Sequence, residues 1–263
     1  MHLLSCFALK EEAAPFRKMA AGTVAAAPAA SILITGIGRR NAEKALREFL
    51  NSCRSRGNET QIKNILESPS ASAELRRDEH VVSYDPDFVL SCGFAGGLNP
   101  DLKLGDVVFD TEFFPSRSRG DETQAEQNTE TPHVVSYNKL VAAGAKPVKF
   151  FCTEHIATTV AEKKKLRAET GADAVEMESA AIHAICRERG IPCATVRVIS
   201  DMANEDLPLD FNALAKPDKS LDYGKLVWTI ARSPGKIGAL LKLQKQTRFA
   251  AERLAHILEK LIR

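Results

Sequence analysis

The chain lacks several features that would place it in common functional classes. Its 263 residues carry a formal net charge of only +2, and no cluster of lysine and arginine is interleaved with aromatic residues. We therefore expect no nucleic-acid partner. No apolar run approaches the length of a membrane-spanning helix. The apolar segment Leu3–Leu9 is short and has no basic leader, which predicts a strand and not a signal peptide.

Metal-binding cysteine pairs are missing as well. None of the six cysteines forms a CxxC pair, so we expect no metal site. The cysteines lie mostly in apolar strand or helix contexts, which favours buried free thiols in a reducing cytoplasm and predicts a cytoplasmic protein. They are Cys6, Cys53, Cys92, Cys152, Cys186 and Cys193.

The sequence does contain one stretch, residues 174–201, in which strand and helix signals follow each other closely. After a short apolar run, apolar residues recur at helical spacing from Met177 to Ile185. Gly190 ends this predicted helix, and Pro192 blocks its continuation. The almost wholly apolar run Cys193–Ile199 is typical of a strand buried on both faces.

Acidic side chains mark the two junctions of this stretch. Glu176 and Glu178 stand where the first strand becomes a helix, and Ser200 and Asp201 stand where the second strand ends. Ligands of open α/β sheets bind outside the carboxyl ends of strands, so both acidic spots can face one crevice. A purely structural interpretation is also open, because acids at a helix start and Ser-Asp after a strand are ordinary helix-terminus features.

Three further segments carry candidate site residues. Glu12 follows the first predicted strand, where it could simply be an acid at a helix start. The Gly-rich turn Gly36–Gly38 precedes Arg39 and Arg40, which could neutralise a phosphate or lie at the surface. The run 92–98 has three glycines that let a backbone approach a ligand closely, and we expect it to form a loop.

Two of these motifs carry a family resemblance. Val175-Glu-Met-Glu178, followed by Arg197-Val-Ile-Ser-Asp201, resembles the signature of the 5′-methylthioadenosine/S-adenosylhomocysteine nucleosidases, which belong to the nucleoside phosphorylase superfamily. The Gly-rich segments are similar to the family's Gly-Ile-Gly turn and Gly-Ser-Ala-Gly-Gly-Leu run. The resemblance covers nearly the whole chain.

Pattern and resemblance together predict one α/β domain over residues 1–263, a three-layer α/β/α sandwich around a mixed, mostly parallel sheet. Four predicted strands should lie side by side in this sheet. They are Leu3–Ala8, Ser31–Thr35, Phe88–Ser91 and Cys193–Ile199.

The resemblance implies cleavage of the bond between a purine and ribose, as in a 5′-substituted adenosine. Asp201 would protonate the leaving base at N7, with Ser200 orienting its carboxyl group. Glu178 would accept hydrogen bonds from the ribose hydroxyls, and Glu12 would activate the attacking water. No metal or organic cofactor is needed for this chemistry.

Further site residues follow from the same resemblance. Met177 would form an apolar wall beside the sugar, and Ala95 and Gly96 would contact ribose and water. Glu176 is assigned either a direct or a supporting role. Ile156 matches the position of an aromatic residue that stacks on the purine in the family, although isoleucine cannot stack.

Water is the favoured nucleophile, but phosphate stays open as a co-substrate. Phosphorylases of the superfamily have an arginine and a serine where this chain has Ser91 and Phe94. Arg39 and Arg40 keep phosphorolysis open. A nucleoside-binding protein without catalysis is a third alternative, against which the presence of all three candidate carboxylates argues.

The C-terminal third supports softer expectations. The segment around Leu207 and the basic tail resemble the hopanoid-associated phosphorylases, which release adenine from adenosylhopane. A basic amphipathic helix at 235–262 could pack on the domain, dimerise or bind a membrane surface weakly. We expect a homo-oligomer, with a dimer favoured. The polar segment 116–133 is predicted to be a mobile loop, and Lys163–Lys165 a solvated helix face.

Overall fold

The computed structural model describes residues 2–21, 29–55, 86–110, 137–216, 223–232 and 234–262. The strands are β1 (His2–Phe7), β2 (Ala29–Ile34), β3 (Phe88–Gly97), β4 (Val107–Asp110), β5 (Lys146–Val148), β6 (Phe150–Cys152), β7 (Ala174–Glu176) and β8 (Cys193–Asp201). The helices are α1 (Lys10–Ala21), α2 (Arg39–Ser55), α4 (Tyr137–Ala143), α5 (Val160–Thr170), α6 (Ser179–Arg189), α7 (Phe211–Leu214), α8 (Tyr223–Arg232), the short 3₁₀ helix η2 (Pro234–Lys236) and α9 (Ile237–Ile262).

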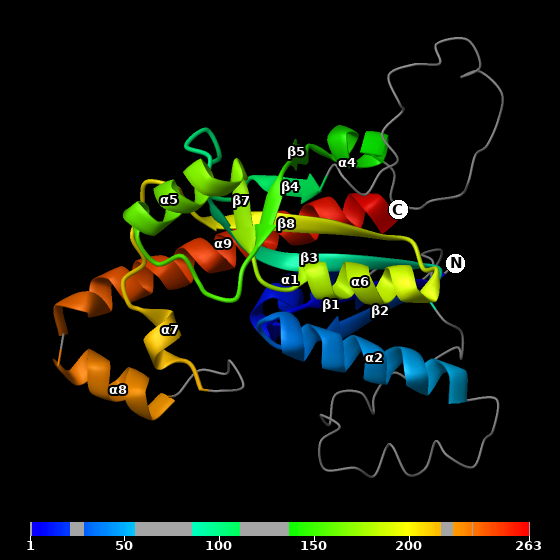
Figure 1. Cartoon of the computed structure of the whole chain (residues 1–263), viewed down its shortest axis with the longest axis horizontal. Coiled ribbons are helices and arrows are strands. Elements are labelled where there is room, and N and C mark those ends of the chain that lie inside the picture. The colour runs from blue at the N-terminus through cyan, green and yellow to red at the C-terminus, as the bar shows by residue number, and fades with distance from the viewer. Residues whose placement is uncertain are drawn as a thin grey trace.

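The described strands form one eight-stranded sheet (Figure 1). Its main order is β2-β1-β3-β8-β4-β5, while β7 pairs with β3 and β6 pairs with β7. The pairs β3–β7 and β4–β8 are antiparallel, and the other strand pairs are parallel. The mixed, mostly parallel sheet is therefore confirmed, and the four strands predicted to lie side by side are the neighbours β2, β1, β3 and β8.

Helices cover both faces of the sheet, which confirms the three-layer arrangement. On one face, α1 and α9 pack against β1, β3 and β8, with Phe16 and Leu254 in the shared core. On the other face, α2 and α6 supply Leu46 and Ile182 to a second core. Every residue of β8 is buried, because this strand runs through the middle of the sheet and is covered on both sides.

The C-terminal helix α9 has two different halves. Leu254 and Leu258 are fully buried in the core, so the second half packs on its own domain. In the first half Leu240 is partly buried, while Ile237 and Leu241 are 45% and 54% exposed. Weak membrane contact therefore stays a prediction, and it is confined to the first half of α9. Taken over the described residues, no helix is both long and apolar enough to cross a bilayer.

The Gly-rich run 92–98 differs from the sequence expectation, because it is mostly strand and not loop. Strand β3 continues through it as far as Gly97. The reason is close packing: a Cβ atom on Gly93 would lie 2.7 Å from Arg197 Nη1, and one on Gly96 would lie 3.3 Å from Asp201 Oδ2. Glycine in a strand often marks such a close approach. The predicted loop at 116–133 lies outside the described residues.

Candidate active site

A cavity of about 380 Å³ opens beside the carboxyl ends of β1, β3 and β8 and the junction of β7 with α6. Its wall also includes residues from the segment between β6 and α5, from α7 and from α9. No lysine or arginine lines the cavity among the described residues, and most of the other lining residues are apolar. Five acidic residues do line it: Glu11, Glu12, Glu176, Glu178 and Asp201.

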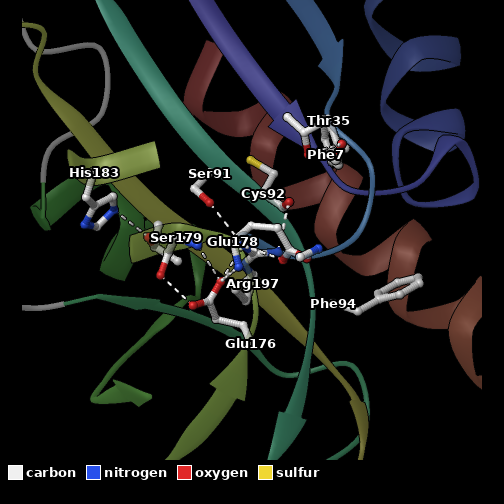
Figure 2. Close-up of polar contacts among 12 residues, drawn as sticks. Phe7, Thr35, Ser91, Cys92, Phe94, Glu176, Glu178, Ser179, His183 and Arg197 are labelled. Carbon is white, nitrogen blue, oxygen red and sulfur yellow. Dashed lines mark hydrogen bonds and ion pairs between the residues drawn. The ribbon is translucent and has the colours of Figure 1, made fainter. Parts of the chain in front are cut away.

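Arg197 on β8 organises the acidic side of the cavity, although the sequence analysis gave it no role. Figure 2 shows its guanidinium between β3 and the carboxylates of Glu176 and Glu178. Nη2 lies 2.7 Å from Glu176 Oε2, 3.3 Å from Glu178 Oε2 and 3.1 Å from the Ser91 hydroxyl oxygen. Nη1 donates to the Cys92 carbonyl at 3.2 Å. Although burial lowers the pKa of Arg197, the surrounding carboxylates outweigh that effect, and the pKa is raised overall.

Glu176 is fully occupied by protein donors. Its Oε2 accepts hydrogen bonds from the backbone N–H groups of Glu178 and Ser179, at 3.0 and 2.8 Å, and its Oε1 accepts one from the Ser179 hydroxyl at 2.6 Å. Burial raises the pKa of Glu176, but Arg197 and these donors outweigh it, so the pKa is lowered overall. Glu176 therefore holds Arg197 and the start of α6 in place.

Glu178 presents a carboxylate with fewer protein partners. Its Oε1 accepts a hydrogen bond of 2.8 Å from the Gly38 N–H, and its Oε2 contacts Arg197. Burial raises the pKa of Glu178 to about 7, with Glu176 adding to the rise and Arg197 opposing it. A group that titrates near neutrality is well placed to gain or lose a proton when a ligand binds.

Glu12 lies at the first turn of α1 and is 4% exposed. Its Oε1 accepts a hydrogen bond from the Phe94 N–H, and its Oε2 one from the Leu9 N–H, both at 2.9 Å. Burial raises the pKa of Glu12, while these donors and the charge of Arg197 offset part of the rise. A raised pKa is suited to a carboxylate that takes a proton near neutral pH.

Asp201 is the last residue of β8 and lines the cavity. The register of β3 and β8 shifts between Ala95 and Gly96, so that Gly96 pairs with Asp201. Such bulges re-aim side chains near sites. The Ser200 hydroxyl donates to Asp201 Oδ1 at 2.8 Å, and Lys163 Nζ lies 2.6 Å from Oδ2.

Lys163 corrects the sequence interpretation of a solvated lysine run. Its side chain is completely buried, whereas Lys164 and Lys165 are exposed. The usable signal was spacing, because Lys163 lies three residues after Val160 and three before Leu166, on the inward face of α5. The rest of the run fits the predicted solvated face.

Most of the remaining predicted binding residues line the cavity. Met177, Ala95, Gly96 and Ile156 all line the cavity, as does Ser200. The Ile156 backbone is paired with the amide of Asn212, which accepts from the Ile156 N–H at 2.9 Å and donates to its carbonyl at 2.8 Å.

The predicted anion group is divided. Gly36 and Gly38 both have positive φ, at 81° and 89°, and Gly38 reaches the cavity through its bond to Glu178. Arg39 and Arg40 are exposed at the start of α2 and do not line the cavity. The structure therefore does not bring these two arginines to the site.

Several lining residues were not singled out as site residues from the sequence. Ring-bearing side chains of Phe94, His155 and Phe211 line the cavity, and so do Leu243 and Thr247 of α9. His155 directly precedes Ile156, so a ring is present next to the predicted position. Nothing in the composition of α9 indicated that two of its residues would reach a site formed by distant strands.

A family model described as the Phosphorylase superfamily matches residues 10–222. The chain belongs to this superfamily. All the predicted catalytic and binding residues of this superfamily member lie within the matched part, while α8 and α9 lie beyond it. The two α9 residues that line the cavity therefore come from outside the region that the superfamily model covers.

Individual relatives are more distant. The 5′-methylthioadenosine/S-adenosylhomocysteine nucleosidase of Shewanella halifaxensis is 32% identical over 150 residues, which cover 50% of this chain and 64% of that protein. The aminodeoxyfutalosine nucleosidase of Campylobacter jejuni is 30% identical over 143 residues, covering 47% and 60%. The match thus spans less than two thirds of either relative. A nucleosidase structure from Colwellia psychrerythraea in complex with adenine has a TM-score of 0.53 at 18% identity, over 100% of this chain and 94% of that one, and shows a shared fold.

Proposed function

We propose that the protein cleaves the N-glycosidic bond of a purine nucleoside, most favourably a 5′-substituted adenosine, and releases the base with water as nucleophile. The observation that carries this proposal is the cavity wall, which combines apolar surface with five carboxylates and no described lysine or arginine. Such a wall suits a neutral ligand that has hydroxyl groups to donate. It also stabilises the positive charge that develops on a sugar when the bond to its base breaks.

Relatives support the same reaction class. Two of them are named as nucleosidases, for 5′-methylthioadenosine/S-adenosylhomocysteine and for aminodeoxyfutalosine, and the solved Colwellia relative contains adenine. These substrates differ in the group attached to the sugar. We therefore propose the class of substrate, a purine nucleoside with a modified 5′ carbon, and leave the 5′ group to the experiment below.

In the proposed mechanism the leaving base departs on the side of Asp201. This carboxyl group passes a proton to purine N7, which makes the base a better leaving group. Ser200 holds Oδ1 of Asp201 by donating a hydrogen bond of 2.8 Å. The rings of His155 and Phe211 line the same cavity and offer surfaces against which a purine can pack.

The sugar would lie against Glu178 and Met177. Glu178 accepts hydrogen bonds from ribose hydroxyls and, once ionised, stabilises the cationic sugar. Arg197 and the Gly38 N–H fix the carboxylate in position. Met177, which is 8% exposed and lines the cavity, supplies the apolar contact.

Glu12 would hold the attacking water. Two backbone N–H groups orient its carboxylate, and burial raises its pKa toward the range in which it can accept a proton from water. As the water oxygen bonds to the anomeric carbon, its proton moves to Glu12. The electron pair of the broken bond stays with the base.

The acidic lining of the cavity disfavours phosphorolysis. A phosphate dianion in the described cavity would meet carboxylates and no lysine or arginine, since Arg197 is held by its own partners and Arg39 and Arg40 are exposed elsewhere. Bringing a dianion to such a surface is costly. The hopanoid-associated activity stays a prediction from the C-terminal third.

The test is to incubate the protein with a panel of 5′-substituted adenosines, with and without phosphate, and to measure free adenine and the sugar product. Adenine and free sugar without phosphate would support the proposal, and a strict need for phosphate would replace it with phosphorolysis. Tight binding of adenosine analogues without turnover would support a binding protein. We expect Asp201→Asn to fold and bind but to lose at least about 100-fold in turnover, and unchanged turnover would remove Asp201 from the mechanism.

A further inference from the structure

Lys163 is a buried charge to which the proposed mechanism assigns no role. Its Nζ donates hydrogen bonds to the carbonyls of Met202 and Glu205, both at 2.8 Å, and forms an ion pair with Asp201 Oδ2 at 2.6 Å. An ammonium group has three N–H donors, and the two carbonyls engage two of them. The capping box of Thr159 and Glu162 at the start of α5 fixes the helix so that Lys163 points at the end of β8.

Burying this ammonium needs an explanation. Taking an ion out of water costs several kcal/mol, and a well-packed apolar side chain could fill the same space without that cost. The lysine is also placed on a particular group, namely the carboxylate that the proposed function assigns to the leaving base. Both facts indicate a role in the chemistry and not in stability alone.

The position of the cation decides where the proton of this pair resides. Lys163 Nζ contacts Oδ2 of Asp201, and the Ser200 hydroxyl donates to Oδ1. Each carboxylate oxygen of Asp201 thus has a cationic or hydroxyl partner. An ionised carboxylate has no proton to give, yet cleavage requires one at purine N7. The proton of the pair therefore rests on Lys163 before the reaction.

We propose that Lys163 is a positioning residue that orients Asp201 and stores the proton which Asp201 passes to the leaving base. This inference rests on the proposed function. The Lys163 ammonium first passes a proton to Asp201 Oδ2 across their 2.6 Å contact, and Asp201 gives a proton to N7 as the C–N bond breaks and its electron pair goes to the base. Lys163 then regains a proton through Asp201, which lines the cavity, and the proton of the attacking water leaves by Glu12.

Other charged groups near Lys163 are engaged elsewhere. The Glu205 carboxylate accepts from Lys242 at 2.6 Å and from Gln246 at 3.2 Å. Asp206 accepts from the Val160 N–H at 2.6 Å. Among the described residues, Asp201 is thus the carboxylate in contact with the Lys163 ammonium. Burial raises the pKa of Glu205, but its hydrogen bonds from Lys242 and Gln246 and the charges of Lys242 and Lys163 lower it overall, so removal of Lys163 also affects Glu205.

The experiment compares the full-length protein with three variants, using steady-state adenine release over a range of pH. Lys163→Met removes charge and proton, Lys163→Arg keeps a charge that cannot be given up, and Lys164→Met controls for removal of a neighbouring exposed lysine. We expect both Lys163 variants to lose at least about 100-fold in kcat with KM changed by less than about threefold. Lys164→Met should match the wild type.

The pH profile separates this role from a structural one. In Lys163→Met the Asp201 carboxylate has no ammonium to supply its proton, so the alkaline limb of the kcat profile should move to lower pH. Wild-type kcat and an unmoved profile in Lys163→Met would overturn the inference, and so would full activity of Lys163→Arg.

Folding is checked by thermal melting and by calorimetric binding of adenine. If Lys163→Met does not fold, Lys163→Arg decides, because it keeps the ion pair and removes only the transferable proton. Failure of the wild type itself to release base from any nucleoside would refute the proposed function. Normal release by wild type together with unaffected Lys163 variants would refute only the role of Lys163.

Discussion

The charge balance around Arg197 can be tested through the pH dependence of stability. Two buried carboxylates, Glu176 and Glu178, share one guanidinium, so the cluster carries excess negative charge when both are ionised. Burial raises the pKa of Glu178 from 4.5 to about 7, with a further contribution from Glu176. The folded protein therefore binds a proton at Glu178 more tightly than the unfolded chain does.

A proton that is held more tightly in the folded state makes the free energy of unfolding fall as the pH rises. The contribution of Glu178 is fully present below about pH 4.5 and is lost as the pH rises through about 7. Each proton is worth about 1.4 kcal/mol per pH unit in that window. For the shift from 4.5 to about 7 the total loss is roughly 3 kcal/mol.

Glu178→Gln removes this titration. We expect the unfolding free energy of the variant, relative to wild type, to improve by roughly 2–3 kcal/mol between about pH 5 and about pH 8. The contacts of Glu178 with Arg197 and with the Gly38 N–H favour the ionised carboxylate, and their effect is already contained in its net pKa. His183, whose pKa is lowered to about 4 by burial, titrates in both proteins and cancels.

The assay is urea unfolding followed by far-ultraviolet circular dichroism at the two pH values. A difference between variant and wild type that does not change with pH would refute the reasoning. It would mean that Arg197 compensates both carboxylates and that the excess charge has no net cost. The same variant should lose turnover, because an amide cannot accept hydrogen bonds from the ribose hydroxyls as a carboxylate does.

Two other expectations can be checked separately. Gly93→Ala would place a Cβ 2.7 Å from Arg197 Nη1 at a φ of +144°, so we expect a loss of about 1–3 kcal/mol in unfolding free energy. Gly144→Ala, at φ +98° with nothing within 4 Å of the added Cβ, controls for backbone strain. Equal losses in the two variants would contradict the contact explanation. We also expect weak sedimentation with anionic liposomes at low salt only, reduced in Leu241→Glu; a supernatant protein at low salt would end the membrane hypothesis.

The sequence predicts the fold correctly where burial of apolar side chains alone determines the structure. Strands such as Cys193–Ile199 are nearly all apolar, and helices show a single apolar face, so burial alone sets both. Glu178 and Asp201 were accessible for a related reason: they follow strands, and strand ends meet at one edge of a sheet. Their spacing does not reveal the chemical roles of Glu178 and Asp201, and these roles stay predictions from the resemblance.

The misses share a different physical cause. In the run Lys163–Lys165 the residue type is the same at each position. The spacing to Val160 and Leu166 indicates which lysine faces inward, but only the packing of α5 beside β8 brings that side chain to Asp201. Arg197 offered a clearer signal, because an arginine inside a run expected to be buried on both faces requires buried acceptors. The Gly-rich run was assigned to a loop because the packing of Gly93 against Arg197 is a contact between distant parts of the sequence.

The two ion clusters of the site are unequal, and the inequality suits the proposed reaction. Around Arg197 there are two carboxylates, with Glu12 nearby, so that side of the cavity favours positive charge. At Asp201 the Lys163 ammonium balances the carboxylate, so that side can supply a proton to a group that becomes negative. Breaking a bond between ribose and a purine separates charge in this sense, with the sugar becoming positive and the base negative. If both clusters were neutral, we expect the site to bind the nucleoside equally tightly but to stabilise the charge-separated transition state less. Only stabilisation that is stronger in the transition state than in the bound substrate accelerates a reaction.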